Sequence, residues 1–299
     1  MPPYVWFAFV GAIGLAASGL VAKIMVRYRI CNADLVTWSI GLGASIAALT
    51  LWIILRPPFP SLAAWPMFGL VGSLLLAGLF LNRAIQEGDA SMVLPLLSMK
   101  IPVTALLAFL ILDESHTPSV YAAVVLSAGA MALFGLGRQE AAQGGHGRHP
   151  VFALALAVLA ACVYATADQM AKLALGEYEW LSVALWGHML LGPFCLAMLF
   201  NRHYRQYRVG ALDIAVFLCN GFVLVGAVCG LYIAFEAADG VTVPNVILGS
   251  RGLFVLAAGY LLRGALKVPM ERQPPSVYAL RAAGTILFLA AILLVSSAG

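Results

Sequence analysis

The sequence predicts an all-α, polytopic membrane protein, because of its composition, its low charge content and its recurring apolar runs. Of the 299 residues, 63% are hydrophobic and only 10% are charged, and the mean hydropathy is +0.96. Soluble domains average about 25% charged residues, so this chain has too little polar material to cover a water-facing globule. Apolar runs of about 20 residues, the length of one helical span, recur along the whole chain. The short connections between them exclude a large extramembrane catalytic module.

Ten transmembrane helices are predicted, one for each apolar window between charged, Pro-rich or Gly-rich clusters. They cover residues 4–26, 35–55, 65–87, 90–112, 119–135, 151–173, 180–200, 211–236, 241–262 and 276–297. The longest connection, LGRQEAAQGGHGRHP, is polar and Gly-rich and lies at the midpoint, which predicts a linker. We therefore expect a first five-helix repeat over residues 1–137, a linker over residues 138–150 and a second five-helix repeat over residues 151–299.

Matching features in the two halves indicate that they are repeats. They recur in the same order and at nearly constant separation: Lys23 with Lys172, Trp38 with Trp186, Asp89 with Asp239, Lys100 with Arg251, and the pentapeptide PSVYA at 118–122 and 275–279. Five is an odd number of crossings, so the second repeat must enter the membrane in the opposite sense. Inverted repeats are typical of secondary transporters with a site near the bilayer midplane. An inert duplicated helical bundle is the alternative.

The distribution of positive charge between the loops predicts the orientation in the membrane. Two loop cations, Arg56 and Lys172, fall on the side of the termini. Thirteen fall on the side of the linker: Lys23, Arg27, Arg29, Arg83, Arg138, Arg148, Arg202, Arg205, Arg208, Arg263, Lys267, Arg272 and Arg281. We therefore expect an integral protein of the cytoplasmic (inner) membrane, with the linker in the cytoplasm and both termini outside.

The segment 84–98 (AIQEGDASMVLPLLS), running on to 110–114 (LILDE), resembles the drug/metabolite transporter superfamily, EamA type. In that family the fourth helix commonly begins with small residues and a proline and ends in a Leu-Gly-Glu-Arg-like turn. Here Asp113-Glu114-Ser115 replaces Gly-Glu-Arg, and the corresponding turn of the second half, 263–265 (RGA), has no acidic residue. The resemblance extends over essentially the whole chain and implies a ten-helix transporter whose termini are usually cytoplasmic, in contrast to the charge count.

Two cations near the middle of predicted helices are the main candidates for substrate binding. Lys100 and Arg251 would each cost about 2.5–3.5 kcal/mol at the bilayer centre, so they are expected to face a wet cavity or a partner. The resemblance implies that their helices line a central cavity and that phosphate-bearing substrates are held by such residues. Converging cations favour a carboxylate or phosphate, which an arginine can bind bidentately. Alternatively, each cation is neutralised by an internal carboxylate.

Other residues are expected to support this site. Asp168 lies four residues before Lys172, which favours a local ion pair; binding of a coupling proton is its alternative role. Ser98 and Asn245 could add hydrogen bonds to a ligand. Three prolines are expected to kink the helices that carry the cations, either at the site or as packing kinks: Pro95, Pro102 and Pro244.

The remaining candidates are aromatic. Four of them fall within spans and either line the cavity or pack against neighbours: Trp38, Tyr164, Trp186 and Tyr232. His188 is expected to be a buried histidine with its hydrogen bonds satisfied. The chain lacks HExxH, GxSxG and paired intramembrane histidines, so it is not expected to be an enzyme. We expect no metal, cofactor or nucleic acid.

Together these features predict a secondary active transporter that moves a small organic solute bearing a carboxylate or a phosphate by alternating access, with export as one direction. One alternative is an exporter of amino acids or hydrophobic metabolites through a mainly apolar cavity. Others are a flippase for a phosphate-bearing lipid, a non-transporting scaffold and an intramembrane enzyme. The expected partners are the small-molecule substrate, the lipid bilayer and, if Asp168 titrates, a coupling proton; the oligomeric state stays open.

Overall fold

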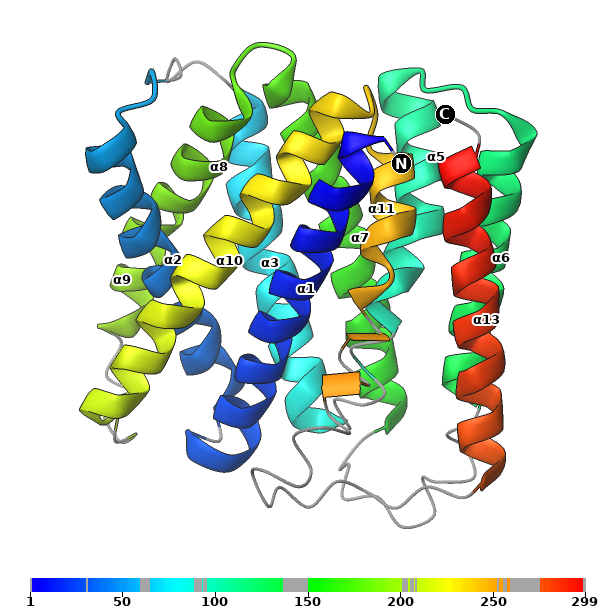
Figure 1. Cartoon of the computed structure of the whole chain (residues 1–299). Helices are drawn as coiled ribbons and strands as arrows, with labels where there is room; N and C mark the ends of the chain where they lie inside the picture. Colours follow the sequence, from blue (N-terminus) through cyan, green and yellow to red (C-terminus); the bar gives the residue numbers. More distant parts are fainter. Residues whose placement is uncertain are drawn as a thin grey trace.

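The computed structural model of this chain is a bundle of helices (Figure 1). It describes residues 2–30, 32–59, 65–88, 93, 96–136, 150–200, 204, 207, 209–251, 253–254, 257–258 and 275–297. The elements are α1 (Pro3–Ile24), the π-helical turn η1 (Met25–Arg29), α2 (Ala33–Leu55), α3 (Trp65–Glu87), the 3-10 turn η2 (Leu97–Met99), α5 (Lys100–Leu112), α6 (Pro118–Leu136), α7 (Pro150–Leu175), α8 (Trp180–Met189), α9 (Leu191–Leu199), α10 (Ala211–Ala237), α11 (Thr242–Leu248) and α13 (Pro275–Ser297).

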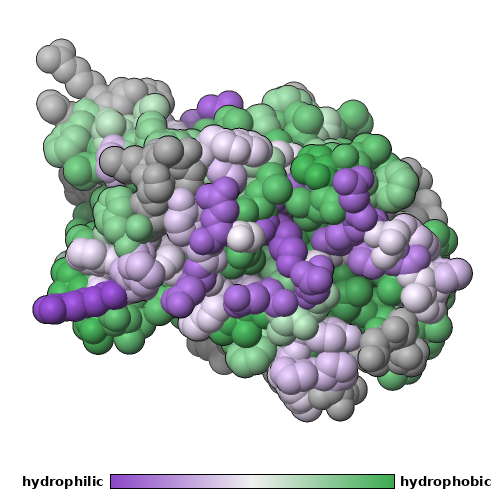
Figure 2. Space-filling view, turned by 90° about the horizontal axis from the view of Figure 1, so that it is seen from above, coloured by the Kyte–Doolittle hydropathy of each residue, from purple (hydrophilic) through white to green (hydrophobic). Residues whose placement is uncertain are grey.

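Within these residues the prediction of an all-α protein is confirmed, because no strand is present. Six helical segments are long and apolar enough to cross a membrane: Pro3–Ile24, Ala33–Leu55, Trp65–Glu87, Val151–Leu175, Trp180–Leu199 and Ala211–Ala237. Large apolar side chains such as Ile54, Phe109 and Leu293 are exposed on the outside of the bundle. Seen from the end at which α1 begins, polar side chains gather toward the middle and apolar ones lie around the rim (Figure 2). This distribution fits a polytopic membrane protein.

Helices of the two halves of the chain pack against each other throughout the bundle. α1 and α2 pack on α10, α3 and α5 pack on α7, and α6 packs on α13. α7 lies in the interior and buries a series of alanines: Ala153, Ala157, Ala160, Ala161, Ala165, Ala167, Ala171 and Ala174. Small side chains let helix backbones approach closely in a membrane, where packing rather than water exclusion holds helices together. This contact brings the central residues of α3, α5, α7 and α10 to one region.

The predicted helix 180–200 is divided by a turn at Leu190 into α8 and α9. Pro193 has no N–H, so the carbonyl of Met189, four residues earlier, loses its helical hydrogen bond. The Ser45 hydroxyl of α2 donates to that carbonyl at 3.2 Å. A neighbouring helix thus satisfies the freed backbone group, as break points in membrane helices require.

The predicted helices 90–112 and 241–262 are also not continuous. α5 begins only at Lys100, after η2, and α11 ends at Leu248, followed by a turn at Gly249 and Ser250 before Arg251 resumes the helix. Pro102 and Pro244 lie in the first turns of α5 and α11, where a helix needs no N–H from them. Pro95 lies outside the described residues.

Glu114, in the connection between α5 and α6, joins the first half of the chain to the second. It accepts hydrogen bonds from the backbone N–H of Val241 at 2.9 Å and the hydroxyl of Thr242 at 3.1 Å, at the start of α11. His116 lies 3.1 Å from the same carboxylate. Burial alone would raise the pKa of Glu114, but the hydrogen bonds from His116, Val241 and Thr242 outweigh it and hold this pKa below its ordinary value of 4.5.

Helices α2 and α10 cross where two glycines meet. A Cβ on Gly221 would collide with the backbone of Gly43, and a Cβ on Gly43 would collide with the carbonyl of Phe217. Gly226, in the same helix α10, has nothing within 4 Å of its Cβ position. The crossing therefore requires a glycine at Gly221 but not at Gly226.

We expect Gly221→Ala to lower the thermal unfolding temperature of the purified protein, because the added methyl group forces the two backbones apart. Gly226→Ala is the matched control and should leave this temperature unchanged or slightly raised, since alanine favours the helix. Equal unfolding temperatures for the two variants would contradict the close crossing.

Glu114→Gln should lower the unfolding temperature, because a buried, charge-assisted hydrogen-bond network contributes about 1–3 kcal/mol. A carboxylate whose pKa is depressed by folding stabilises the protein fully above its unfolded pKa, and this stabilisation is lost as the pH falls through the folded pKa. The difference from the unmodified protein should therefore be largest above pH 4.5 and shrink in more acidic buffer. The exposed Glu177→Gln is the control. A difference that stays constant down to low pH would argue against the charged network.

Candidate functional site

A cavity of about 180 Å³ lies in the middle of the bundle, between α1, α2, α3, α5, α7, α8 and α10. α1 contributes residues 15–22, α2 residues 37–44 and α3 residues 74–82. In these three helices, most of the lining residues lie in the half of the bundle farther from the start of α1 (Figure 1). Most of the lining is apolar, with leucines such as Leu74, Leu97 and Leu224. On α7 and α10 the lining residues fall within 164–168 and 224–232, in the half of each helix nearer the end at which α1 begins, so the cavity spans the centre of the bundle.

Lys100 and Asp168 line this cavity and form a buried ion pair. The Lys100 Nζ lies 2.7 Å from the Asp168 Oδ2, and the two side chains are 6% and 8% exposed. The expected pair between Asp168 and Lys172 does not form, because Asp168 points to α5. Lys172 instead contacts the Oδ1 of Asp239 at 3.2 Å.

Arg251 also lines the cavity, at the point where the helix resumes after the turn that follows α11. It interacts electrostatically with the Tyr164 hydroxyl and with Asp168, and no described carboxylate lies within ion-pair distance of it. Lys100, Asp168 and Arg251 are the charged residues in the lining. Two cations therefore face one carboxylate, which leaves one positive charge without a counter-charge among the described residues.

Several buried polar atoms lie on the helices behind the ion pair. Gln169 donates to the Thr104 carbonyl at 3.2 Å and links α7 to α5. Asn245 donates to the Val241 carbonyl at 2.8 Å and does not line the cavity. Atoms without a hydrogen-bond partner among the described residues include Thr104 Oγ1, Gln169 Oε1, Asn245 Oδ1 and Ser250 Oγ. Buried polar atoms in this region of the bundle thus extend beyond the charged groups of Lys100, Asp168 and Arg251.

The structure divides the predicted aromatic residues into two groups. Tyr164 and Tyr232 line the cavity beside the charged residues. Trp38 lies outside the lining and donates from its indole to the Tyr204 hydroxyl at 3.2 Å. Trp186 also lies outside it and packs against Phe59, with ring centroids 3.7 Å apart. The side chain of Ser98 lies outside the described part of the chain.

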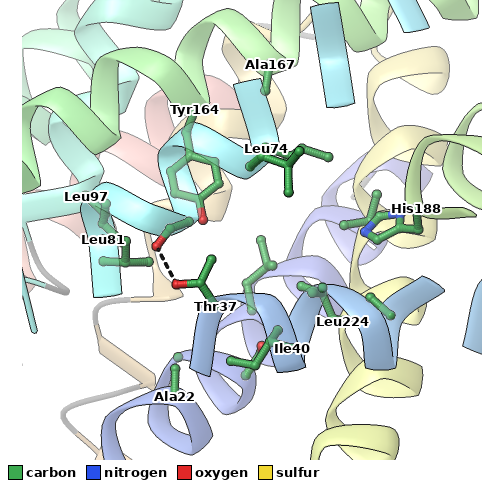
Figure 3. A pocket seen from close by; sticks show the side chains of 18 of the residues that line it. Ala22, Thr37, Ile40, Leu74, Leu81, Leu97, Tyr164, Ala167, His188 and Leu224 are labelled. Atoms are coloured by element: carbon green, nitrogen blue, oxygen red, sulfur yellow. Dashed lines mark hydrogen bonds between the residues drawn. The ribbon is translucent and has the colours of Figure 1, made fainter. Parts of the chain in front are cut away.

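Four polar lining residues had not been predicted for the site: Ser18, Thr37, Asn82 and His188. The Asn82 amide of α3 donates to the Thr37 hydroxyl of α2 at 2.6 Å, and this hydroxyl donates to the Ala33 carbonyl at 2.8 Å. His188 of α8 faces the cavity from the far side of Leu74 (Figure 3). Asn82 interrupts an apolar helix, and that interruption was the sequence signal for it. Among the described residues, no group of three or more His, Cys, Asp and Glu could hold a metal ion.

The ion pair makes a testable prediction about stability. Removing one member of a buried pair leaves the other charge unpaired, which costs about 3–5 kcal/mol, whereas removing both costs much less. Lys100→Met and Asp168→Leu should each lower the unfolding temperature, and the double variant should lose less than the sum of the two. Strictly additive losses would show that the two side chains do not interact.

Comparison with known proteins agrees with this architecture. A solved structure, titled only as the crystal structure of a protein, is similar with a TM-score of 0.67 and 12% sequence identity, and the match covers 98% of each chain. At that identity the likeness shows a shared fold. No curated protein was found to match. Residues 2–136 match the model of the EamA-like transporter family, whose members are transporters rather than enzymes. Over these residues the chain is similar to the EamA-like transporter family of the drug/metabolite transporter superfamily, and six of its described helical segments are long and apolar enough to cross a membrane.

Proposed function

We propose that this chain is a secondary active transporter that moves a small organic anion, bearing a carboxylate or a phosphate, through the central cavity. The observation that carries this proposal is the charge of the lining: Lys100 and Arg251 face the single carboxylate of Asp168. A cation in the membrane interior is costly unless it is paired or solvated. An anionic group of the substrate would complete the pairing.

Arg251 is the residue to which we assign the anion. Lys100 is already held by Asp168 at 2.7 Å, whereas no described carboxylate lies within ion-pair distance of the guanidinium of Arg251. Its planar fork matches a carboxylate or a phosphate with two parallel hydrogen bonds. Both cations lie at the first residue of a helical segment, Lys100 in α5 and Arg251 after the turn. The partial positive charge of a helix N-terminus adds to the attraction for an anion.

The apolar lining supports an organic body for this anion. Leucines from α1, α3, η2, α9 and α10 surround the charged residues, and Tyr164 and Tyr232 add aromatic surface. Such a lining would desolvate an apolar substrate and leave its charged group to Arg251. The same lining supports the second candidate, an exporter of hydrophobic metabolites in which the cations are structural.

Alternating access by two inverted five-helix repeats, over residues 1–137 and 151–299 with a linker between them, fits the geometry. The cavity lies between helices of both halves in the middle of the bundle, while Glu114 joins the two halves near the start of α11. The loop charges would put the linker in the cytoplasm, with the termini outside. Asp168 remains the candidate for a coupling proton, which it would share with Lys100.

Arg251→Gln should weaken anion binding without destabilising the protein, because Arg251 has no carboxylate partner to leave behind among the described residues. We suggest 3-phenylpropanoate as the probe and its amide, 3-phenylpropanamide, as the uncharged counterpart. Binding of the carboxylate should fall about tenfold or more, as expected for a lost charge-assisted hydrogen bond. The amide should bind weakly to both proteins. Titration calorimetry and uptake of labelled probe into proteoliposomes measure these effects.

Arg83→Gln is the matched control, because it removes one positive charge from an exposed ion pair with Asp34. It should retain both binding and uptake. The proposal fails if the unmodified protein binds carboxylate and amide equally, if it binds neither, or if Arg251→Gln transports the carboxylate at the original rate.

A further inference from the structure

His188 presents a fixed hydrogen-bond acceptor to the cavity. Its Nδ1 lies 2.8 Å from the carbonyl of Ala184. A carbonyl oxygen can only accept, so Nδ1 must carry the proton and donate it. In the neutral imidazole the second nitrogen, Nε2, is then an acceptor. The ring lines the cavity, and no described residue makes a hydrogen bond to Nε2.

His188 lies away from the charged residues. Figure 3 shows it on the other side of the cavity from Tyr164, Leu81 and Leu97, with Leu74 between them. Tyr164 is the hydroxyl that interacts with Arg251, and Leu97 lies one turn before Lys100. The His188 ring is buried and hydrogen-bonded to the Ala184 carbonyl, and no described charged group interacts with it electrostatically. The cavity therefore has a cationic side, an apolar middle and a neutral acceptor on the far side.

The helix break at Leu190 holds the ring in this place. α8 ends at Met189, directly after His188, and the Ser45 hydroxyl secures the freed Met189 carbonyl. Because both the ring and the adjacent backbone are hydrogen-bonded, Nε2 is presented with little freedom. A fixed, desolvated acceptor discriminates strongly between ligands with and without a matching donor.

We propose that His188 Nε2 accepts a hydrogen bond from a hydroxyl or N–H group of the substrate. The substrate class is then an organic anion with an apolar body and a hydrogen-bond donor at the end opposite its charge. This inference rests on the proposed function, because the anionic end at Arg251 sets the direction in which the donor points. His188 is thus assigned as the residue that determines specificity at the far end.

Two probes that differ only in the donor test this assignment: 3-(4-hydroxyphenyl)propanoate and 3-(4-fluorophenyl)propanoate. The unmodified protein should bind the hydroxyl probe about two- to tenfold more tightly, the range of one neutral hydrogen bond. In His188→Phe the ratio of the two affinities should fall to about one, whereas His188→Gln, which keeps an acceptor oxygen, should preserve part of it. A purely structural role of His188 would weaken both probes equally and leave the ratio unchanged.

The same variants separate this inference from the proposed function. The preference for 3-phenylpropanoate over its amide reports on Arg251 and should survive in His188→Phe. If that preference persists while the hydroxyl-to-fluoro ratio is about one in the unmodified protein, or is unaltered in His188→Phe, the His188 assignment is wrong and the anion site stands. If the carboxylate preference itself is missing, the anion site fails first. His188→Leu provides the same comparison should the phenylalanine variant not fold.

Discussion

The charge balance inside the bundle is the constraint on which the site depends. Lys100 and Asp168 are both more than nine-tenths buried and lie 2.7 Å apart, so either one alone would be an uncompensated charge in a membrane protein's interior. Arg251 faces the same cavity with no described carboxylate to neutralise it. A fold that keeps such a cation must provide water or a ligand for it. The cavity has space for water and for a ligand. The packing of α5, α7 and the segment after α11, which brings the three charges to this cavity, therefore supports the proposed transport function.

Interruptions in the helices position the charged and polar side chains of the site. Lys100 begins α5, Arg251 follows the turn at Gly249 and Ser250, and His188 precedes the break at Leu190. In a membrane such interruptions are tolerated where a neighbour or a cavity satisfies the backbone, as Ser45 does for Met189. The interrupted helices present two cations from one side and an acceptor from the other to the same space.

The free-energy cost of a charge in the bilayer interior was enough to single out Lys100 and Arg251 from the sequence, because such side chains are not expected to face lipid. It did not identify the partner of Asp168. A helical i,i+4 pair with Lys172 contributes only about 0.2–0.5 kcal/mol, so a tertiary contact with a buried lysine prevails over it. Kinks were expected in the two cation-bearing helices because of their prolines, but the break at Leu190 was not predicted, because hydropathy windows average over a turn of one residue. His188 was expected to have both ring nitrogens hydrogen-bonded; Nδ1 contacts the Ala184 carbonyl, whereas no described residue makes a hydrogen bond to Nε2. The role of Glu114 in joining the two halves could not be predicted, because it depends on contact with Val241 and Thr242, which lie far away in the sequence.

The central claim is that the cavity carries one positive charge that an organic anion neutralises at Arg251. An experimentally determined structure of the protein with 3-phenylpropanoate tests this most directly. The account predicts density for the carboxylate within hydrogen-bonding distance of the Arg251 guanidinium, with the Lys100–Asp168 pair intact and the phenyl ring among the leucines. An Arg251 side chain engaged by a protein carboxylate, with the probe bound elsewhere, would contradict it.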